Sequence, residues 1–125
     1  MSTPKDLFFA STHEWVKYTP QGTAFVGLSD HAQQELGDVA FINLCDEGEG
    51  LAINDVLGDI ESIKAVSDVY CPINGTVIRV NDALLDNPEQ INSDPYGSWL
   101  VELGDIERNN ELMDAKEYDK YLSEN

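Results

Sequence analysis

Lys64 is the residue whose surroundings most clearly indicate chemistry, because similar residue types flank it on both sides. Read outward from Lys64-Ala65, the matched pairs are Ile63 with Val66, Ser62 with Ser67, Glu61 with Asp68, Ile60 with Val69, and Val56 with Ile73. This matching predicts a β-hairpin in that register, since a slip by one residue would move apolar side chains to the wrong face. The hairpin would have a two-residue turn at Lys64-Ala65 and would carry Lys64 at its tip.

Two features of the predicted hairpin are poor choices for stability. Lys-Ala is a weak two-residue turn, whereas Asn74-Gly75 is a strong one and predicts a second hairpin between residues 69–73 and 76–80. Glu61 opposite Asp68 would set like charges across the strands, at a cost of up to about 1 kcal/mol. Because violations of folding rules tend to mark functional sites, we expect Lys64 to be functional.

Attachment of a covalent group suits Lys64 better than catalysis does. A Schiff-base lysine needs desolvation or a cationic neighbour to become a nucleophile at neutral pH. Lys64 instead has Glu61 and Asp68 nearby in the sequence, and acids favour the ammonium form. An ordinary solvated lysine is the alternative, but the flanking symmetry favours a lysine displayed to a modifying enzyme.

Short strands separated by turn residues dominate the rest of the chain, which predicts a mainly β fold of sandwich or small-barrel type with helices outside it. The predicted strands are 14–18, 23–28, 39–44 and 98–103. Ser29 and Gly37 are suited to begin and end a short helix. A helical turn is predicted at 82–86 and an amphipathic helix at 111–122.

Composition excludes several function classes. The chain has 125 residues with 24 acids against seven bases, a formal net charge of −17, which opposes binding to nucleic acid or anionic lipid and favours a monomer. No apolar run is long enough to cross a bilayer and no targeting pattern opens the chain, so a cytoplasmic protein is expected. One domain spanning residues 1–125 is expected at this length, with Cys45 and Cys71 reduced.

Motifs for other chemistries are incomplete. His13-Glu14 could open a zinc-protease motif, but Lys17 stands where the second histidine ligand belongs. Two histidines and two separated cysteines do not have the paired spacing of a zinc site, so no metal is expected. A thiol enzyme built on Cys71 and a histidine stays formally open and would show a low-pKa cysteine.

With Lys64 singled out, the chain resembles the H proteins of the glycine cleavage system over nearly its whole length. The segments that carry the resemblance are His13–Val16, VGLSDHAQQELGD at 26–38, ESIKAVSDVYCPINGTVIRVN at 61–81, and INSDPYG at 91–97. The block from Glu61 to Asp68 is the most specific of them. The fold that this resemblance implies is a barrel-sandwich hybrid like that of lipoyl domains, with short peripheral helices and a C-terminal helix.

The resemblance also implies a function. Lipoic acid would be bound covalently to Lys64, and the protein would be a non-catalytic carrier. Its arm would take an aminomethyl group from the pyridoxal-phosphate glycine decarboxylase to the tetrahydrofolate-dependent aminomethyltransferase. Dihydrolipoamide dehydrogenase, an FAD enzyme, would then reoxidise the arm. A lipoate ligase or lipoyl/octanoyl transferase would attach it.

Four further residues join the cofactor-binding set by this resemblance. The loaded arm would rest in a surface crevice where its amine meets Glu14, Asp68 and the Thr12 hydroxyl, and Glu61 belongs to the block around the lysine. Such an amine can be held by charge-assisted hydrogen bonds. Three departures from the family pattern are Thr12 in place of the frequent Ser, Cys71 in place of Ser or Ala, and a shorter loop at 94–99.

Alternative functions stay open at this point. An H-like protein that relays lipoate to other enzymes would need the same hairpin. A biotin carrier would be expected to have Met on both sides of its lysine, but here the neighbours of Lys64 are Ile63 and Ala65. A lipoyl domain of a 2-oxoacid dehydrogenase would more often have Asp before the lysine and a flexible linker. An unmodified interaction module would have an idle Lys64.

Overall fold

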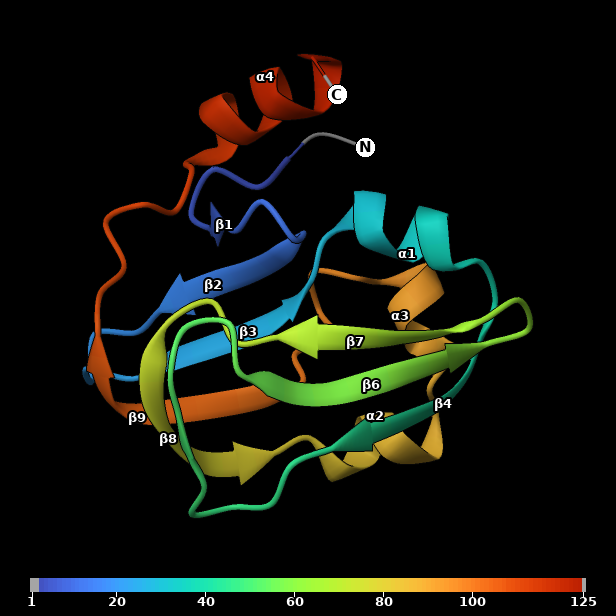
Figure 1. Cartoon of the computed structure of the whole chain (residues 1–125), viewed down its shortest axis with the longest axis horizontal. Coiled ribbons are helices and arrows are strands. Elements are labelled where there is room, and N and C mark those ends of the chain that lie inside the picture. Colours follow the sequence, from blue (N-terminus) through green and yellow to red (C-terminus); the bar gives the residue numbers. More distant parts are fainter. Residues whose placement is uncertain (1–2, 125) are drawn as a thin grey trace.

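The computed structural model describes residues 3–124, which form nine strands in two antiparallel sheets and four helices (Figure 1). The larger sheet has the strand order β1-β2-β3-β9-β8-β5 and the smaller one β4-β6-β7. The strands are β1 Phe8–Phe9, β2 Glu14–Tyr18, β3 Ala24–Leu28, β4 Val39–Leu44, β5 Gly50–Leu51, β6 Val56–Ser62, β7 Val66–Tyr70, β8 Asn74–Val80 and β9 Val101–Glu107. The helices are α1 Asp30–Leu36, α2 Asp82–Asp86, α3 Gln90–Ser93 and α4 Ala115–Glu124.

The main core consists of apolar side chains from both sheets. Alternate residues of each strand point to one face, and on the facing sides these include Val26, Ile60, Val69, Val77 and Leu103, all fully buried. Burial of each such side chain contributes roughly 1.5–3 kcal/mol. The mainly β architecture with peripheral helices and a C-terminal helix confirms the predicted fold class.

A second apolar cluster fixes α4 against the larger sheet. Tyr118 of α4 stacks on Phe9 of β1 with ring centroids 4.3 Å apart, beside Trp15. The helix begins at Ala115, later than the predicted residue 111, because Asp114 caps it. The Asp114 carboxylate accepts a hydrogen bond from the Glu117 N–H, and the Glu117 carboxylate accepts one from the Asp114 N–H.

The β6–β7 hairpin carries Lys64 at its tip, but its register differs from the prediction by two residues. Glu61 pairs with Val66 and Ile60 with Ser67, so the turn residues are Ile63-Lys64 and not Lys64-Ala65. A shift by two leaves every side chain on the same face, so the pattern of buried and exposed residues cannot distinguish the two registers. The predicted like-charge pair of Glu61 with Asp68 was therefore wrong; Asp59 lies opposite Asp68 instead.

Local hydrogen bonds explain the register that forms. The Ser62 hydroxyl accepts hydrogen bonds from the N–H groups of Lys64 and Ala65, both at 3.2 Å, and the Ser62 N–H donates to the Ala65 carbonyl. A serine that precedes the turn thus satisfies the donors of the turn. Neither Ile63 nor Lys64 has a positive φ, so the turn does not need the glycine or asparagine of the usual hairpin types.

The hairpin predicted at Asn74-Gly75 was wrong. The two segments that flank it belong to different sheets, because β7 pairs with β6 while β8 pairs with β5 and β9. Pro72, which has no N–H to donate, lies between β7 and β8, where the chain passes from one sheet to the other. Asn74 instead opens β8, and its side-chain oxygen accepts a hydrogen bond from the Ile53 N–H.

Most other predicted elements agree with the structure. Strands 14–18 and 39–44 and the helical turn 82–86 have the predicted bounds, and β3 is one residue shorter at its start. The strand predicted at 98–103 begins later and extends to Glu107. The short β1, β5 and α3 were not predicted. Within residues 3–124 no helix is long and apolar enough to span a membrane. The predicted domain bounds include residues 1–2 and 125, which lie outside the described part.

Candidate functional site

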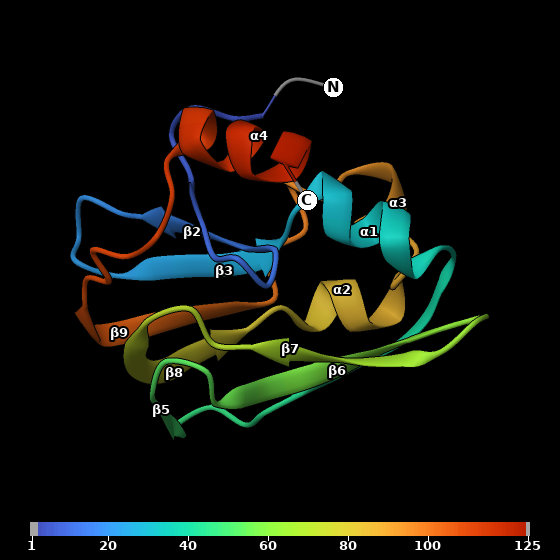
Figure 2. The ribbon, with the colours of Figure 1, turned by 45° about the horizontal axis from the view of Figure 1, so that its top comes forward.

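Lys64 lies at the exposed tip of the β6–β7 hairpin. The tip of the β6–β7 hairpin projects beyond the rest of the chain at the right of both views (Figures 1 and 2). The side chain is exposed and its Nζ donates one hydrogen bond, 3.0 Å long, to the Glu35 carbonyl at the end of α1. Among residues 3–124 Lys64 forms no ion pair. The amine is therefore accessible and weakly tethered.

The loop after α1 supports the base of the hairpin tip. The Asp38 carbonyl accepts a hydrogen bond from the Ile63 N–H. Asn92 of α3 holds this loop, because its side chain accepts from the Val39 N–H at 2.9 Å and donates to the Gly37 carbonyl at 2.8 Å. Gly37 has φ of 74°. A side chain there would meet the Lys64 side chain at 3.1 Å, so glycine suits both the backbone and the close approach.

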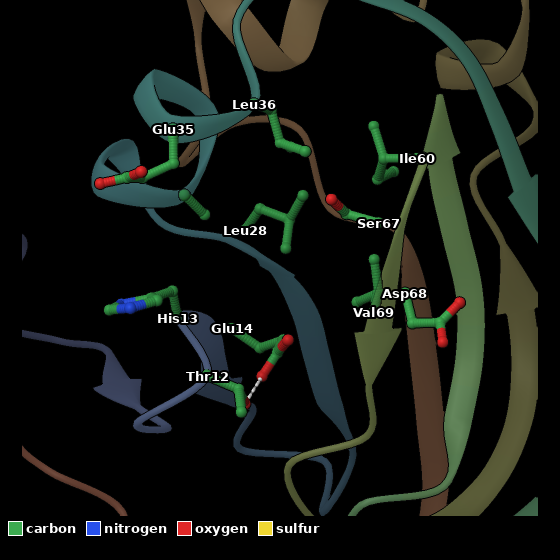
Figure 3. Close-up of a pocket in the computed structure, with 11 residues that line it drawn as sticks. Thr12, His13, Glu14, Leu28, Glu35, Leu36, Ile60, Ser67, Asp68 and Val69 are labelled. Atoms are coloured by element: carbon green, nitrogen blue, oxygen red, sulfur yellow. Dashed lines mark hydrogen bonds between the residues drawn. The ribbon is translucent and has the colours of Figure 1, made fainter. Parts of the chain in front are cut away.

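A groove of about 160 Å³ opens beside the helix end to which Lys64 is tethered (Figure 3). Glu35, whose carbonyl binds the Lys64 amine, lies on its rim. Its walls are mostly apolar and come from the end of β3, from α1 and from the inner face of the hairpin. They comprise Leu28, Ala32, Leu36, Ile60 and Val69. Thr12, His13 and Glu14 form the opposite, polar end.

Glu14 is a buried carboxyl group at the polar end of this groove. Its side chain is 2% exposed, and burial raises its pKa to about 7 although hydrogen bonds partly oppose that shift. The Thr12 hydroxyl donates to one carboxyl oxygen, and the Tyr70 N–H donates to the other at 3.3 Å. The turn that joins β1 to β2 brings Thr12 and Glu14 together, with His13 in the left-handed region at φ of 78°.

The groove brings together three of the four further residues of the predicted cofactor-binding set, since Thr12, Glu14 and Asp68 all line it. Thr12 and Glu14 are hydrogen-bonded to each other there. The Asp68 carboxylate points away from Glu14, to the far side of β7 (Figure 3), and Glu61 also lies on that outer face, where it accepts a hydrogen bond from Asn43. Alternation along the strands causes this division, since Ile60 and Ser67 point inward.

A chain of aromatic and polar groups beside Glu14 was missed by the sequence analysis. His13 Nδ1 lies 2.7 Å from the Tyr118 hydroxyl, which lies 2.8 Å from the Ser29 hydroxyl. The His13 ring also packs on His31 at 4.5 Å between centroids. Burial, and next the neighbouring His31, lower the pKa of His13, while Glu35 opposes the shift. No signal in the sequence joins residue 13 to residue 118.

The remaining candidates concern metal binding and thiol chemistry. Within residues 3–124 no group of three or more His, Cys, Asp or Glu side chains could hold a metal ion. Both cysteines are free thiols. Cys71 is fully buried, its thiol donates to the Ile73 carbonyl, and burial raises its pKa to about 11. Such a thiol is a packing residue and not the low-pKa nucleophile of a thiol enzyme.

Comparisons with known proteins agree with this geometry. The glycine cleavage H-protein family matches residues 7–125. The glycine cleavage system H protein of Lachnoclostridium phytofermentans is 43% identical, over 98% of this chain and 96% of that protein. The probable glycine cleavage system H protein of Thermococcus gammatolerans is 49% identical, over 93% and 89% respectively.

The fold is matched by a solved structure as well. The crystal structure of a glycine cleavage system H protein from Mycobacterium marinum superimposes with a TM-score of 0.89, at 35% identity, covering 96% of this chain and 98% of that one. A family match over nearly the whole sequence, an exposed lysine at a hairpin tip and the same fold agree with one another. The chain belongs to the glycine cleavage H-protein family.

Proposed function

We propose that this chain is a carrier that bears a lipoyl group in amide linkage on Lys64 and serves the glycine cleavage system. The observation that carries the proposal is the exposed amine of Lys64, which forms no ion pair among residues 3–124 and is held by a single hydrogen bond to the Glu35 carbonyl. Such an amine can be reached by a modifying enzyme, and an arm built on it can swing.

The residues near Lys64 suit this group. A lipoyl arm is a long apolar chain that ends in a disulfide ring, and the groove offers apolar walls from Leu36, Ile60 and Val69. The groove opens beside Glu35, which binds the lysine amine, so an arm could lie along it without a change of fold. When bound, the lipoyl group supplies the sulfur atoms on which an aminomethyl group is carried.

Glu14 and Thr12 would hold the amine of that cargo. A buried carboxyl group with a pKa of about 7 is half neutral near physiological pH while the groove is empty. An incoming ammonium group favours the ionised carboxylate and lowers its pKa again. The Thr12 hydroxyl keeps one carboxyl oxygen in place. Asp68 also lines the groove, but its carboxylate, like that of Glu61, lies on the outer face, so we assign neither of them to the amine.

The proposal includes four partners and no catalysis by this chain itself. Glycine decarboxylase with pyridoxal phosphate, aminomethyltransferase with tetrahydrofolate, and dihydrolipoamide dehydrogenase with FAD would act on the arm in turn. A lipoate ligase or a lipoyl/octanoyl transferase would attach it. The carrier contributes a tether, which keeps the cargo at a high effective concentration near each enzyme. Its cytoplasmic location and monomeric state stay predictions.

Intact-mass measurement after incubation with lipoate, ATP and a lipoate ligase tests the attachment site. The chain should gain the mass of one lipoyl group, Lys64→Arg should gain none, and the exposed control Lys17→Arg should behave like the unaltered chain. A lipoyl group on another lysine would contradict the proposal. The lipoylated protein should then support glycine–bicarbonate exchange with glycine decarboxylase, whereas an H-like lipoate relay would be lipoylated without supporting exchange.

A further inference from the structure

Two large apolar side chains lie exposed on the outer face of the small sheet, close to Lys64. Phe41 of β4 pairs with Glu61 of β6, which pairs with Val66 of β7, so the three form one row across the sheet. Phe41 is 65% exposed and Val66 62%. This outer row, Phe41, Glu61 and Val66, lies one residue pair further from the turn than Ser62 and Ala65. Exposed apolar side chains grouped in this way mark interaction surfaces.

The next row on the same face is acidic. Asp59 lies between Asn43 and Asp68 across the strands. The Asn43 side chain donates to Asp59 at 2.8 Å and to Glu61 at 3.1 Å, which orients both carboxylates. Among residues 3–124, none of the carboxylates of Asp59, Glu61 and Asp68 is in an ion pair. The outer face is therefore apolar near the tip and negative behind it.

We propose that this outer face is the docking surface of the enzyme that acylates Lys64, with Phe41 as its anchoring side chain. The inference rests on the proposed attachment at Lys64. The partner surface that fits it has an apolar pocket for Phe41 and Val66 and a rim of Lys or Arg side chains for the acids. Figure 1 looks onto this face, where β4, β6 and β7 lie in front of the larger sheet.

Among the four proposed partners, the acylating enzyme is selected because it forms a bond at the Lys64 amine itself. In acylation the deprotonated Nζ attacks the carbonyl carbon of a lipoyl adenylate, the amide C–N bond forms, the C–O bond to AMP breaks, and the Nζ proton passes to solvent. No electrons are exchanged with an oxidant or reductant. The active site must therefore reach Nζ itself and contact the residues around it, whereas the enzymes of glycine cleavage act at the far end of a flexible arm.

The two faces of the hairpin then have separate tasks. The inner face, with Ile60, Ser67 and Val69, lines the groove in which the finished arm can lie. The outer face, with Phe41 and Val66, stays free whether or not the groove is filled. An enzyme docked on the outer face would thus leave the groove open to the new arm.

Initial rates of acylation test the proposal, with purified unmodified protein, lipoate, ATP and a lipoate ligase. Phe41→Ser should lower kcat/KM at least about tenfold, mainly through KM, as loss of an anchoring residue does. The matched control is Ile78→Ser on β8, which removes a 47% exposed apolar side chain from the other sheet and should change the rate less than about twofold. Asp59→Asn with Asp68→Asn should weaken the salt dependence of the rate.

Several outcomes would overturn the inference while leaving the proposed function intact. One is a Phe41→Ser protein that is acylated like the unaltered chain. Another is normal acylation combined with a tenfold loss of glycine–bicarbonate exchange by the lipoylated variant, which would assign the face to the decarboxylase. Self-association that Phe41→Ser abolishes would assign it to a second copy. If Phe41→Ser does not fold by circular dichroism, Val66→Ser gives the same test. Failure of the unaltered chain to be acylated at Lys64 would instead contradict the proposed function.

Discussion

The Glu14 carboxyl group is buried, and its hydrogen bonds compensate only in part for the water that it loses. Its carboxyl group accepts hydrogen bonds from Thr12 and from the Tyr70 N–H, but these do not offset the loss of solvation, so its pKa lies near 7. Because the ionised carboxylate is unfavourable in this buried place, a cation that binds beside it would stabilise the ionised form. The residue type could be read from the sequence, but its burial could not, because the Tyr70 N–H comes from a strand 56 positions away.

The raised pKa of Glu14 predicts how stability depends on pH. Between pH 4.5 and about 7 the folded protein holds a proton on Glu14 that the unfolded chain has lost, so the free energy of unfolding should fall as pH rises through this range. The loss should be on the order of 3 kcal/mol and complete above about pH 7. Denaturant unfolding at several pH values, compared with Glu14→Gln, should show the difference between the two proteins change by this amount.

An exposed carboxylate provides the control for that measurement. Glu111→Gln removes an exposed carboxylate from the segment before α4 and serves as the matched control. A difference for Glu14→Gln that changes with pH no more than the difference for Glu111→Gln would contradict the raised pKa of Glu14.

At the scale of elements, the β6–β7 hairpin shows what a residue pattern can and cannot determine. Matched residue types predicted the hairpin and the tip position of Lys64, and both agree with the structure. They did not determine the register, because a two-residue shift preserves both faces. Asn74-Gly75 shows the converse case. Its residue types favour a hairpin turn, but the strands on either side of it pair in different sheets, so no hairpin forms there.

Ser62 should be the residue that selects the register. Ser62→Ala removes the acceptor of two turn N–H groups, so we expect a loss of about 1 kcal/mol in the free energy of unfolding. Amide hydrogen exchange at Lys64 and Ala65 should also become faster. The control is Ser67→Ala on the opposite strand, whose side chain faces the groove. Equal effects of the two substitutions on exchange at the tip would contradict this role.

At the scale of the whole molecule, the C-terminal helix is joined to the site from a distance. The buried hydroxyl of Tyr118 on α4 lies 2.7 Å from His13 Nδ1 and 2.8 Å from the hydroxyl of Ser29, the N-cap of α1. Sequence periodicity indicated the helix and its apolar face. It could not indicate which strand or loop that face would cover, since this depends on how the two sheets come together.

Tyr118→Phe isolates the contribution of that hydroxyl. The ring would still stack on Phe9, but the buried Ser29 hydroxyl and the half-buried His13 ring would lose a partner, at a cost of about 1–3 kcal/mol. Thermal unfolding should therefore occur several degrees lower. Tyr121→Phe on the same helix, where the hydroxyl lies 3.5 Å from the Ser11 carbonyl, should shift the midpoint less. Equal shifts would show that the Tyr118 hydroxyl contributes nothing specific.

The Lys64 amine, which donates a hydrogen bond to the end of α1, is also one of the few positive charges of the chain. Changes at this amine can therefore be followed through the charge of the whole molecule. An amide nitrogen is uncharged, so modification would take one cation from a chain that has only seven Lys and Arg, and the formal net charge of −17 would become −18. An arm that carries an ammonium group would restore the original value. Native electrophoresis or isoelectric focusing should thus place the modified molecules apart from the bare and the laden molecules, which share one formal charge, so that attachment and loading are each recorded as one unit of charge.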